Sequence, residues 1–229
     1  MLRNQRITVF AAGAVALIAF LAFNPLAMQT RLVQAANAAE DQTATPTETP
    51  APADQAALPD MSLGKPDAPV TIVEYSSLSC PHCAAFHRDV MPALKSEYID
   101  TGKVRYVERE YPLNDSAFAG SVLARCLDPS RFFAFTDLLF SRQDEWANQE
   151  GDALQPLKQF ARQAGLTDAD FDKCIDDQAL QKKILAVRDQ GSKEGVRGTP
   201  TFFINGKIFN GAPTLQALAE AMKPYLSTQ

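Results

Sequence analysis

A Cys-Pro-His-Cys motif at residues 80–83 joins two segments with different hydrophobic periods, and this arrangement limits the topologies open to the chain. Residues 70–75 are apolar and β-branched, which predicts a short buried strand. From Pro81, apolar residues recur every three or four positions as far as Tyr98, which predicts a helix. Proline suits a first helical turn because its missing N–H has no partner there. We therefore expect the motif where a strand leads into a helix N-terminus.

The rest of the pattern predicts a small mixed sheet interrupted by a block of helices. Pro92 lies inside the first helix and should kink it. Further strands are expected at 103–111, 199–204 and 207–209. The last two should be joined by a tight hairpin turn at Asn205-Gly206. Helical spacing is found at 116–127, 129–146, 154–165, 168–194 and, after a Thr214 cap, 215–226. The expected fold class is α/β, with helices flanking the sheet and a helical insertion at about 114–190.

The N-terminal region carries an export signal and a linker. Arg3 and Arg6 precede an apolar run at 7–23, which is the layout of a secretory signal and also approaches the length of a membrane-spanning helix. Residues 1–38 are therefore expected to be a cleaved signal peptide or a retained membrane anchor. Residues 39–60 are rich in proline, alanine and threonine, which predicts a disordered linker before a folded domain at 61–229. Either form of the signal places this domain outside the cytoplasm.

Charge and metal-ligand counts argue against two classes of partner. The chain has a net charge of −5, whereas nucleic-acid binding needs a basic surface. Two histidines and two distant cysteines would complete a four-ligand zinc site poorly. We expect no nucleic acid, no metal and no cofactor.

The motif can work as a redox dithiol only if one cysteine is readily ionised. The helix start favours a Cys80 thiolate by about 0.3 to 2 kcal/mol. Lowering a pKa by three units takes about 4 kcal/mol. His82, as a donor or a positive charge, and N–H groups near the sulfur would have to supply the rest. Stabilising the thiolate stabilises the reduced form, so Cys80 becomes the nucleophile of an oxidising dithiol and Cys83 the resolving thiol. An inert disulfide or half a zinc site are the alternatives.

The chain from about Leu63 to Leu226 resembles the DsbA family of the thioredoxin superfamily. The resemblance is carried by the 80–83 motif, by Glu74 six residues before Cys80, and by Gly-Thr-Pro-Thr at 198–201. It implies a thioredoxin-like fold with an inserted all-helical domain, and the activity of a thiol-disulfide oxidoreductase, here a dithiol oxidase.

The resemblance also implies roles for three residues outside the motif. Pro200 would be cis and face the dithiol, and with Thr199 it would contact the substrate chain as an added strand. Glu74 would be a buried acid that helps proton transfer near Cys83. The sequence itself also allows an ordinary proline at a strand start and a solvent-facing Glu74.

The remaining cysteines and one histidine receive structural interpretations. Cys126 and Cys174 both fall in the helical insertion, and in an oxidising compartment such a pair is usually bonded, so we expect a structural disulfide; two free buried thiols are the alternative. His87 is expected to be a surface or packing histidine. The aromatic segment 132–140 is expected to be core rather than a substrate groove.

The leading hypothesis is a periplasmic oxidase, soluble or tethered to the inner membrane. A substrate thiolate would attack Cys80, form a mixed disulfide and leave the dithiol reduced. The resemblance implies reduced, newly exported proteins as substrates and a DsbB-type membrane protein as the reoxidant. Two alternatives stay open: a disulfide isomerase or reductase of the same superfamily, and a non-enzymatic holdase or metal-handling binding protein.

Overall fold

The computed structural model describes residues 57–147 and 154–227. The predicted export signal and nearly all of the predicted linker therefore lie outside the described residues. Within the described part of the chain, no helix is long and apolar enough to cross a membrane.

A five-stranded mixed sheet organises the described residues, with strand order β1-β3-β2-β4-β5. The central strands β2 and β3 are parallel, and every other neighbouring pair is antiparallel. The strands are β1 (Met61–Leu63), β2 (Val70–Ser76), β3 (Val104–Glu110), β4 (Thr201–Ile204) and β5 (Lys207–Ile208). Parallel strands need a crossover between them, and the helices after the 80–83 motif supply it.

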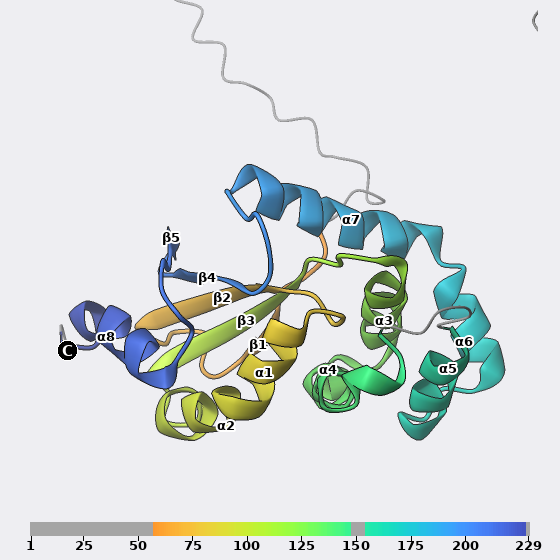
Figure 1. The fold of residues 1–229 in the computed structure, drawn as a ribbon, viewed down its shortest axis with the longest axis horizontal. Coiled ribbons are helices and arrows are strands. Elements are labelled where there is room, and N and C mark those ends of the chain that lie inside the picture. The colour runs from red at the N-terminus through yellow and green to blue at the C-terminus, as the bar shows by residue number, and fades with distance from the viewer. Residues whose placement is uncertain (1–56, 148–153, 228–229) are drawn as a thin grey trace, which may run out of the picture. The chain divides into compact units, whose positions relative to one another are not determined.

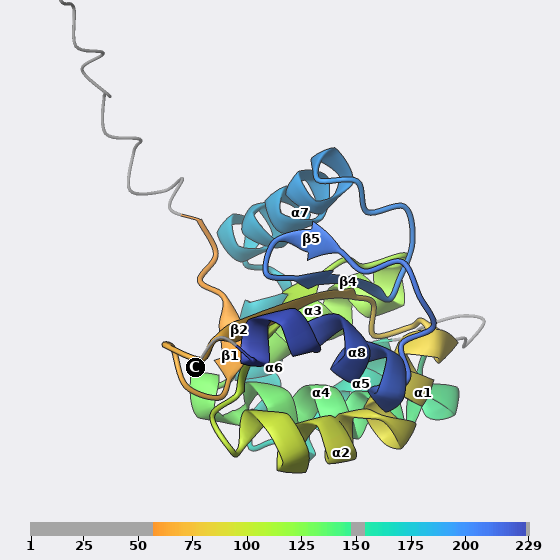
Figure 2. The same ribbon diagram turned by 90° about the vertical axis from the view of Figure 1, so that its left-hand side faces the viewer.

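Helices cover both faces of this sheet (Figures 1 and 2). Ile72, Tyr106 and Phe202 pack on one face with residues of the helices α1, α2 and α8. Tyr75 and Phe203 pack on the other face against α7. The helices are α1 (Pro81–Asp89), α2 (Met91–Leu94), α3 (Asp115–Cys126), α4 (Phe132–Ser141), α5 (Leu154–Gln163), α6 (Asp168–Ile175), α7 (Gln178–Lys193) and α8 (Leu215–Leu226).

The helices α3 to α6 form their own hydrophobic core beside the sheet, at the right of Figure 1. Phe132, Phe135 and Phe140 are buried in it, as the sequence predicts for the aromatic segment. The same core contains Cys80, Cys83 and Ala84 at the start of α1. The thioredoxin-like fold with an inserted helical region is therefore confirmed, and the dithiol lies where the two parts meet.

Several predicted helices are divided more finely than the periodicity indicates. The helix after the motif ends at Asp89, restarts at Met91 with Pro92 in the first turn of α2, and finishes as a π-helix at Lys95–Ile99. Pro92 therefore begins a new helix instead of kinking one. Two 3₁₀ turns, Pro129–Arg131 and Gln143–Glu145, flank α4.

Capping explains the division of the predicted 168–194 helix. The Asp177 side chain accepts a hydrogen bond from the Leu180 N–H, which makes it the N-cap of α7 and ends α6 at Ile175. Apolar period alone does not detect such a break. The edge strand β1 is also absent from the prediction, since three residues are too short to show an alternation.

Candidate active site

The dithiol is held at the junction that the sequence predicts. Cys80 is the N-cap of α1 in an extended conformation, and Pro81 follows in the first turn. The Cys80 N–H donates to the Ser77 carbonyl, which closes a turn after β2. Neither Cys80 nor Cys83 is in a disulfide, and both are buried. The structure thus presents the reduced form of the pair.

A residue of the helical insertion holds the loop in front of the dithiol. Gln143 is buried, and its Nε2 donates to the carbonyls of Leu78 at 2.7 Å and Cys80 at 3.1 Å. Sequence reasoning assigned Gln143 to a helix and gave it no role. No sequence signal identifies it, because the contact spans more than sixty residues of chain.

Hydrogen bonds to the sulfur of Cys80 favour its thiolate. The Cys83 thiol contributes most to lowering the pKa of Cys80, and burial of Cys80 opposes it. A hydrogen bond with the Thr199 side chain and the backbone N–H groups of Cys83 and His82 lower the pKa further. Together they lower the pKa of Cys80 to about 5. The part of His82 in this bonding is its backbone N–H, while its side chain is exposed. This bond belongs to the N–H groups predicted near the sulfur, and the role predicted for the His82 side chain stays a prediction.

Cys83 has the opposite environment. Its side chain is fully buried, and burial raises its pKa strongly; the Cys80 sulfur and the Glu74 carboxylate raise it further. Cys83 therefore stays protonated across the physiological range. One thiolate and one thiol a helical turn apart are the two states that disulfide exchange requires.

Thr199 and Pro200 lie against the dithiol. The Thr199–Pro200 peptide bond is cis, as the resemblance implies. The carbonyl oxygen of Thr199 lies 3.2 Å from the Cys80 sulfur and accepts its S–H hydrogen bond. The geometry implied for this pair is confirmed, and the substrate contact stays a prediction.

Glu74 is buried, so the solvent-facing alternative is wrong. It lies on β2, directly opposite Glu108 of β3 in the parallel register. Its Oε2 accepts a hydrogen bond of 2.5 Å from the Tyr106 hydroxyl. Burial and the nearby charge of Glu74 both raise the pKa of Tyr106, which keeps this phenol a donor.

His87 is buried on α1, so of its two expected settings the packing position is correct. Its ring stacks on Phe140 of α4 at 4.2 Å between centroids. Its two ring nitrogens also approach carboxylates, Glu74 at 3.5 Å and Asp137 at 3.3 Å. Sequence reasoning missed this polar setting because Asp137 belongs to the insertion, fifty residues further along the chain.

The predicted pair of structural cysteines is bonded in the structure. Cys126 ends α3 and Cys174 lies in α6, and their sulfur atoms form a disulfide. It links two helices of the insertion across a separation of 48 residues. Within the described residues, no three His, Cys, Asp or Glu side chains form a group that could hold a metal ion.

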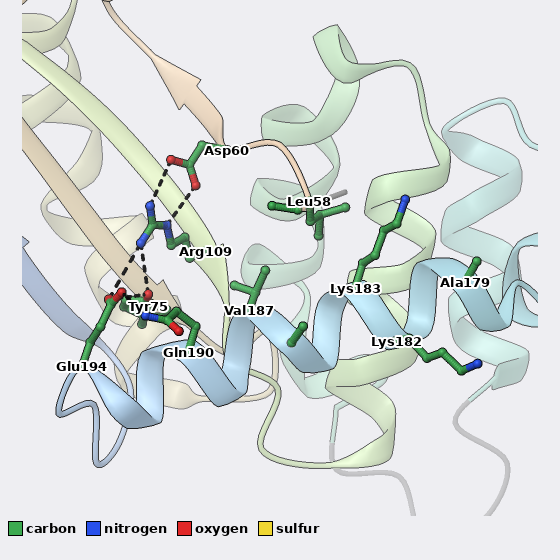
Figure 3. A pocket seen from close by; sticks show the side chains of 12 residues that line it. Leu58, Asp60, Tyr75, Arg109, Ala179, Lys182, Lys183, Val187, Gln190 and Glu194 are labelled. Atoms are coloured by element: carbon green, nitrogen blue, oxygen red, sulfur yellow. Dashed lines mark hydrogen bonds and ion pairs between the residues drawn. The ribbon is translucent and has the colours of Figure 1, made fainter. Parts of the chain in front are cut away.

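A pocket of about 750 Å³ lies between α7, the sheet and the first described residues (Figure 3). At one end, Arg109 donates to Asp60 and to Tyr75, and Tyr75 donates to Glu194. None of the predicted site residues lines it. It is separate from the dithiol chemistry.

Comparisons with known proteins agree with this geometry. A family model described as Thioredoxin matches residues 56–224. A Rickettsia bellii protein named as a protein-disulfide oxidoreductase is 37% identical over 151 residues. The match covers 64% of this chain but only 57% of that relative. A Bacillus anthracis protein named for disulfide bond formation is 32% identical over 170 residues, 70% of this chain and 76% of its own.

Among solved structures, alpha-DsbA1 of Wolbachia pipientis has a TM-score of 0.69 and 30% sequence identity, and the match covers 76% of this chain and 96% of that one. The chain spans little more than half the length of the rickettsial relative, but nearly all of the Wolbachia structure. The structural similarity covers the thioredoxin-like fold with its inserted helical region. The chain belongs to the DsbA family of the thioredoxin superfamily.

Proposed function

We propose that this protein is a thiol-disulfide oxidoreductase that donates the Cys80–Cys83 disulfide to reduced proteins outside the cytoplasm. The observation that carries the proposal is the contrast between the two thiols. The pKa of Cys80 is lowered to about 5, and that of Cys83 is raised. A stabilised thiolate favours the reduced dithiol, so the oxidised form gives up its disulfide readily.

The exchange proceeds in two steps on Cys80. A substrate thiolate attacks the Cys80 sulfur, the Cys80–Cys83 bond breaks, and Cys83 leaves with the electron pair and takes up a proton. The second substrate thiolate then attacks the substrate sulfur of the mixed disulfide, and Cys80 leaves as a thiolate. Two electrons pass from the substrate's two thiols to the dithiol, and one of their two protons ends on Cys83 while the other goes to solvent.

The cis Thr199–Pro200 segment is the proposed contact for the substrate chain. It lies against the attacked sulfur, and the polar backbone before the strand β4 offers hydrogen bonds to an extended peptide. Hydrogen bonds to a substrate backbone do not depend on its side chains, so this contact suits unfolded or partly folded exported proteins. A periplasmic location, a signal peptide or anchor at 1–38 and a DsbB-type membrane reoxidant complete the proposal.

The test compares the oxidised wild-type protein with Cys80→Ser and Cys83→Ser. Oxidation of a reduced, unfolded two-cysteine protein is followed by thiol labelling, and the reduction potential is measured against glutathione. We expect wild type to oxidise the substrate, and both Cys80→Ser and Cys83→Ser to be inactive, because neither variant can form the Cys80–Cys83 disulfide that accepts the substrate's two electrons. A potential as reducing as that of thioredoxin would contradict the oxidase direction, and full activity of Cys80→Ser would contradict the site.

A further inference from the structure

A continuous chain of polar side chains connects the interior next to the dithiol with the surface. Glu74 on β2 and His87 on α1 are buried, with side chains 0% and 3% exposed, whereas Asp137 on α4 is 59% exposed. His87 Nε2 lies 3.5 Å from Glu74 Oε2, and His87 Nδ1 lies 3.3 Å from Asp137 Oδ1. We call these three side chains the His87 chain.

Both ring nitrogens of His87 face oxygen acceptors, which fixes how many protons the three groups hold. A neutral imidazole carries one N–H and would leave one nitrogen lone pair pointing at a carboxylate. The arrangement is satisfied by an imidazolium between two carboxylates. It is equally satisfied when the proton on Nε2 has moved to Glu74 and the imidazole has become neutral.

The exchange reaction gives such a proton a task. When the disulfide opens, Cys83 leaves as a thiolate in a site with no solvent exposure, where an uncompensated charge is costly. The charge of Glu74 already acts on Cys83. A proton must therefore reach this interior when the dithiol is reduced, and leave it when the dithiol is reoxidised.

We propose that His87 conducts this proton between Glu74 and solvent at Asp137. The inference rests on the proposed exchange reaction and deepens it. His87 acts through Glu74 and is a positioning residue, since it touches neither the substrate nor the reacting sulfur atoms.

The proton balance closes over one turnover. As the Cys80–Cys83 bond breaks, Glu74 in its acid form protonates the Cys83 thiolate. A proton from solvent beside Asp137 binds the bare Nδ1 of a neutral, Nε2-protonated His87, and the imidazolium so formed returns its Nε2 proton to Glu74, which leaves a neutral imidazole with its proton on Nδ1. Reoxidation runs the same transfers backward: Cys83 loses its proton to Glu74 as its sulfur attacks, and His87 delivers that proton to the surface. No group is left with an additional charge in either direction.

Other titratable groups around His87 support this route. From β3, the Tyr106 hydroxyl lies 3.5 Å from His87 Nε2 and donates to Glu74. Glu108 is buried beside Glu74, and burial raises its pKa to about 8, although His87 opposes the rise. Burial opposes a charged His87, but Glu74 and Asp137, with a smaller contribution from Glu108, raise its pKa to about 10. At neutral pH the cluster therefore stores protons on His87 and Glu108.

The experiment measures reduction of the Cys80–Cys83 disulfide by glutathione in His87→Phe, Asp137→Asn and Phe140→Leu. Phenylalanine keeps a planar ring of similar size but removes both nitrogens. Phe140→Leu is the matched control, because it removes the ring stacked on His87 and leaves the polar chain in place. Rate constants are taken per glutathione thiolate from pH 6 to 8.

We expect the wild-type rate constant to change little over this range. In His87→Phe it should be at least about tenfold lower at pH 7, which is less than the roughly 10²- to 10⁴-fold of a full proton-transfer contribution. It should also fall about tenfold for each pH unit, because hydronium from solvent then replaces the relay. Asp137→Asn should lie between the two, and Phe140→Leu should stay within about twofold of wild type at every pH.

Each outcome separates this inference from the proposed function. If wild type does not react with glutathione or oxidise a dithiol substrate, the proposed function fails. If wild type reacts but His87→Phe keeps its rate and flat pH profile, only the relay is refuted. An equal loss in Phe140→Leu would also refute it, since packing would then be the cause. If His87→Phe does not fold, the surface variant Asp137→Asn decides: a wild-type profile there overturns the relay.

Discussion

Replacing Cys83 by alanine should raise the pKa of Cys80, because the Cys83 thiol is the strongest single contribution to its low value. A hydrogen bond to a charged group contributes about 1.5 to 3 kcal/mol. At about 1.36 kcal/mol per pKa unit, its loss raises the pKa by about one to two units. From a starting value of about 5, Cys80 should then titrate between about 6 and 7. At pH 6 the thiolate fraction should fall from about nine-tenths to between about one-half and one-tenth.

The matched variant is Cys83→Ser, which keeps a donor at the same position. Its hydroxyl can replace the thiol, so the pKa of Cys80 should stay near 5. The ultraviolet absorbance of the thiolate gives the titration curve, and the rate of alkylation by iodoacetamide at pH 6 gives an independent value. An unchanged midpoint in Cys83→Ala would refute the assignment and leave the backbone N–H groups and Thr199 as the cause.

Three further predictions concern the potential and the stability of the fold. First, the lowered pKa of Cys80 stabilises the reduced dithiol about a hundredfold at pH 7 relative to a cysteine of ordinary pKa, which raises the reduction potential by about 60 mV. This stabilisation is complete only above the ordinary thiol pKa and is lost as the pH falls through about 5. A plot of the potential against pH should therefore change slope near pH 5, from about 30 mV per pH unit above it to about 60 mV per pH unit below it. A single slope from pH 4 to 8 would contradict it. Second, replacing both Cys126 and Cys174 by alanine should lower the free energy of unfolding by about 4 kcal/mol, which is the loop-closure value for 48 residues. Urea titrations under oxidising conditions measure this loss. An unchanged free energy of unfolding would mean that the disulfide does not form in solution. Third, Gly191→Ala would bring a methyl group to 2.6 Å from the Tyr75 ring, so it should destabilise the fold by about 1 to 3 kcal/mol and lower the melting temperature. The control variant Ala186→Gly, on the same helix, tests helix propensity alone. Equal melting temperatures for Gly191→Ala and wild type would exclude the close contact.

Local pattern predicted the elements that set the active-site topology. The strand at 70–75, the helix start at Pro81 and the hairpin at Asn205-Gly206 each have a residue-level cause in apolar period or turn chemistry, and the structure contains all three. The break at Asp177 depends on a side-chain cap, and the break at Val90 comes two residues before Pro92, which has no N–H to continue the helical hydrogen bonds. Period alone therefore predicted helices that were too long.

The site was predictable where its residues share a motif and unpredictable where they meet only in three dimensions. The low pKa of Cys80 follows in direction from its position at a helix start, but its largest cause, the Cys83 thiol, required coordinates. Gln143, Asp137 and Glu108 come from other elements than α1, and no spacing along the chain links them to it. Glu74 was ambiguous because strand alternation allows both faces, and only the covering helices decide between them.

The two hydrogen bonds from Gln143 to the Leu78 and Cys80 carbonyls make the helical insertion structurally inseparable from the reactive loop. An engineer who excised the insertion to obtain a minimal redox domain would remove the Gln143 donor from the Leu78 carbonyl, at a cost of about 1 to 3 kcal/mol. The Cys80 carbonyl would keep only its hydrogen bond from the Ala84 N–H. The same excision would remove the apolar cover of Cys83. Grafting the four-residue motif onto a smaller scaffold would therefore transfer the cysteines without the environment that differentiates them. The transferable unit is the motif together with its lid of helices.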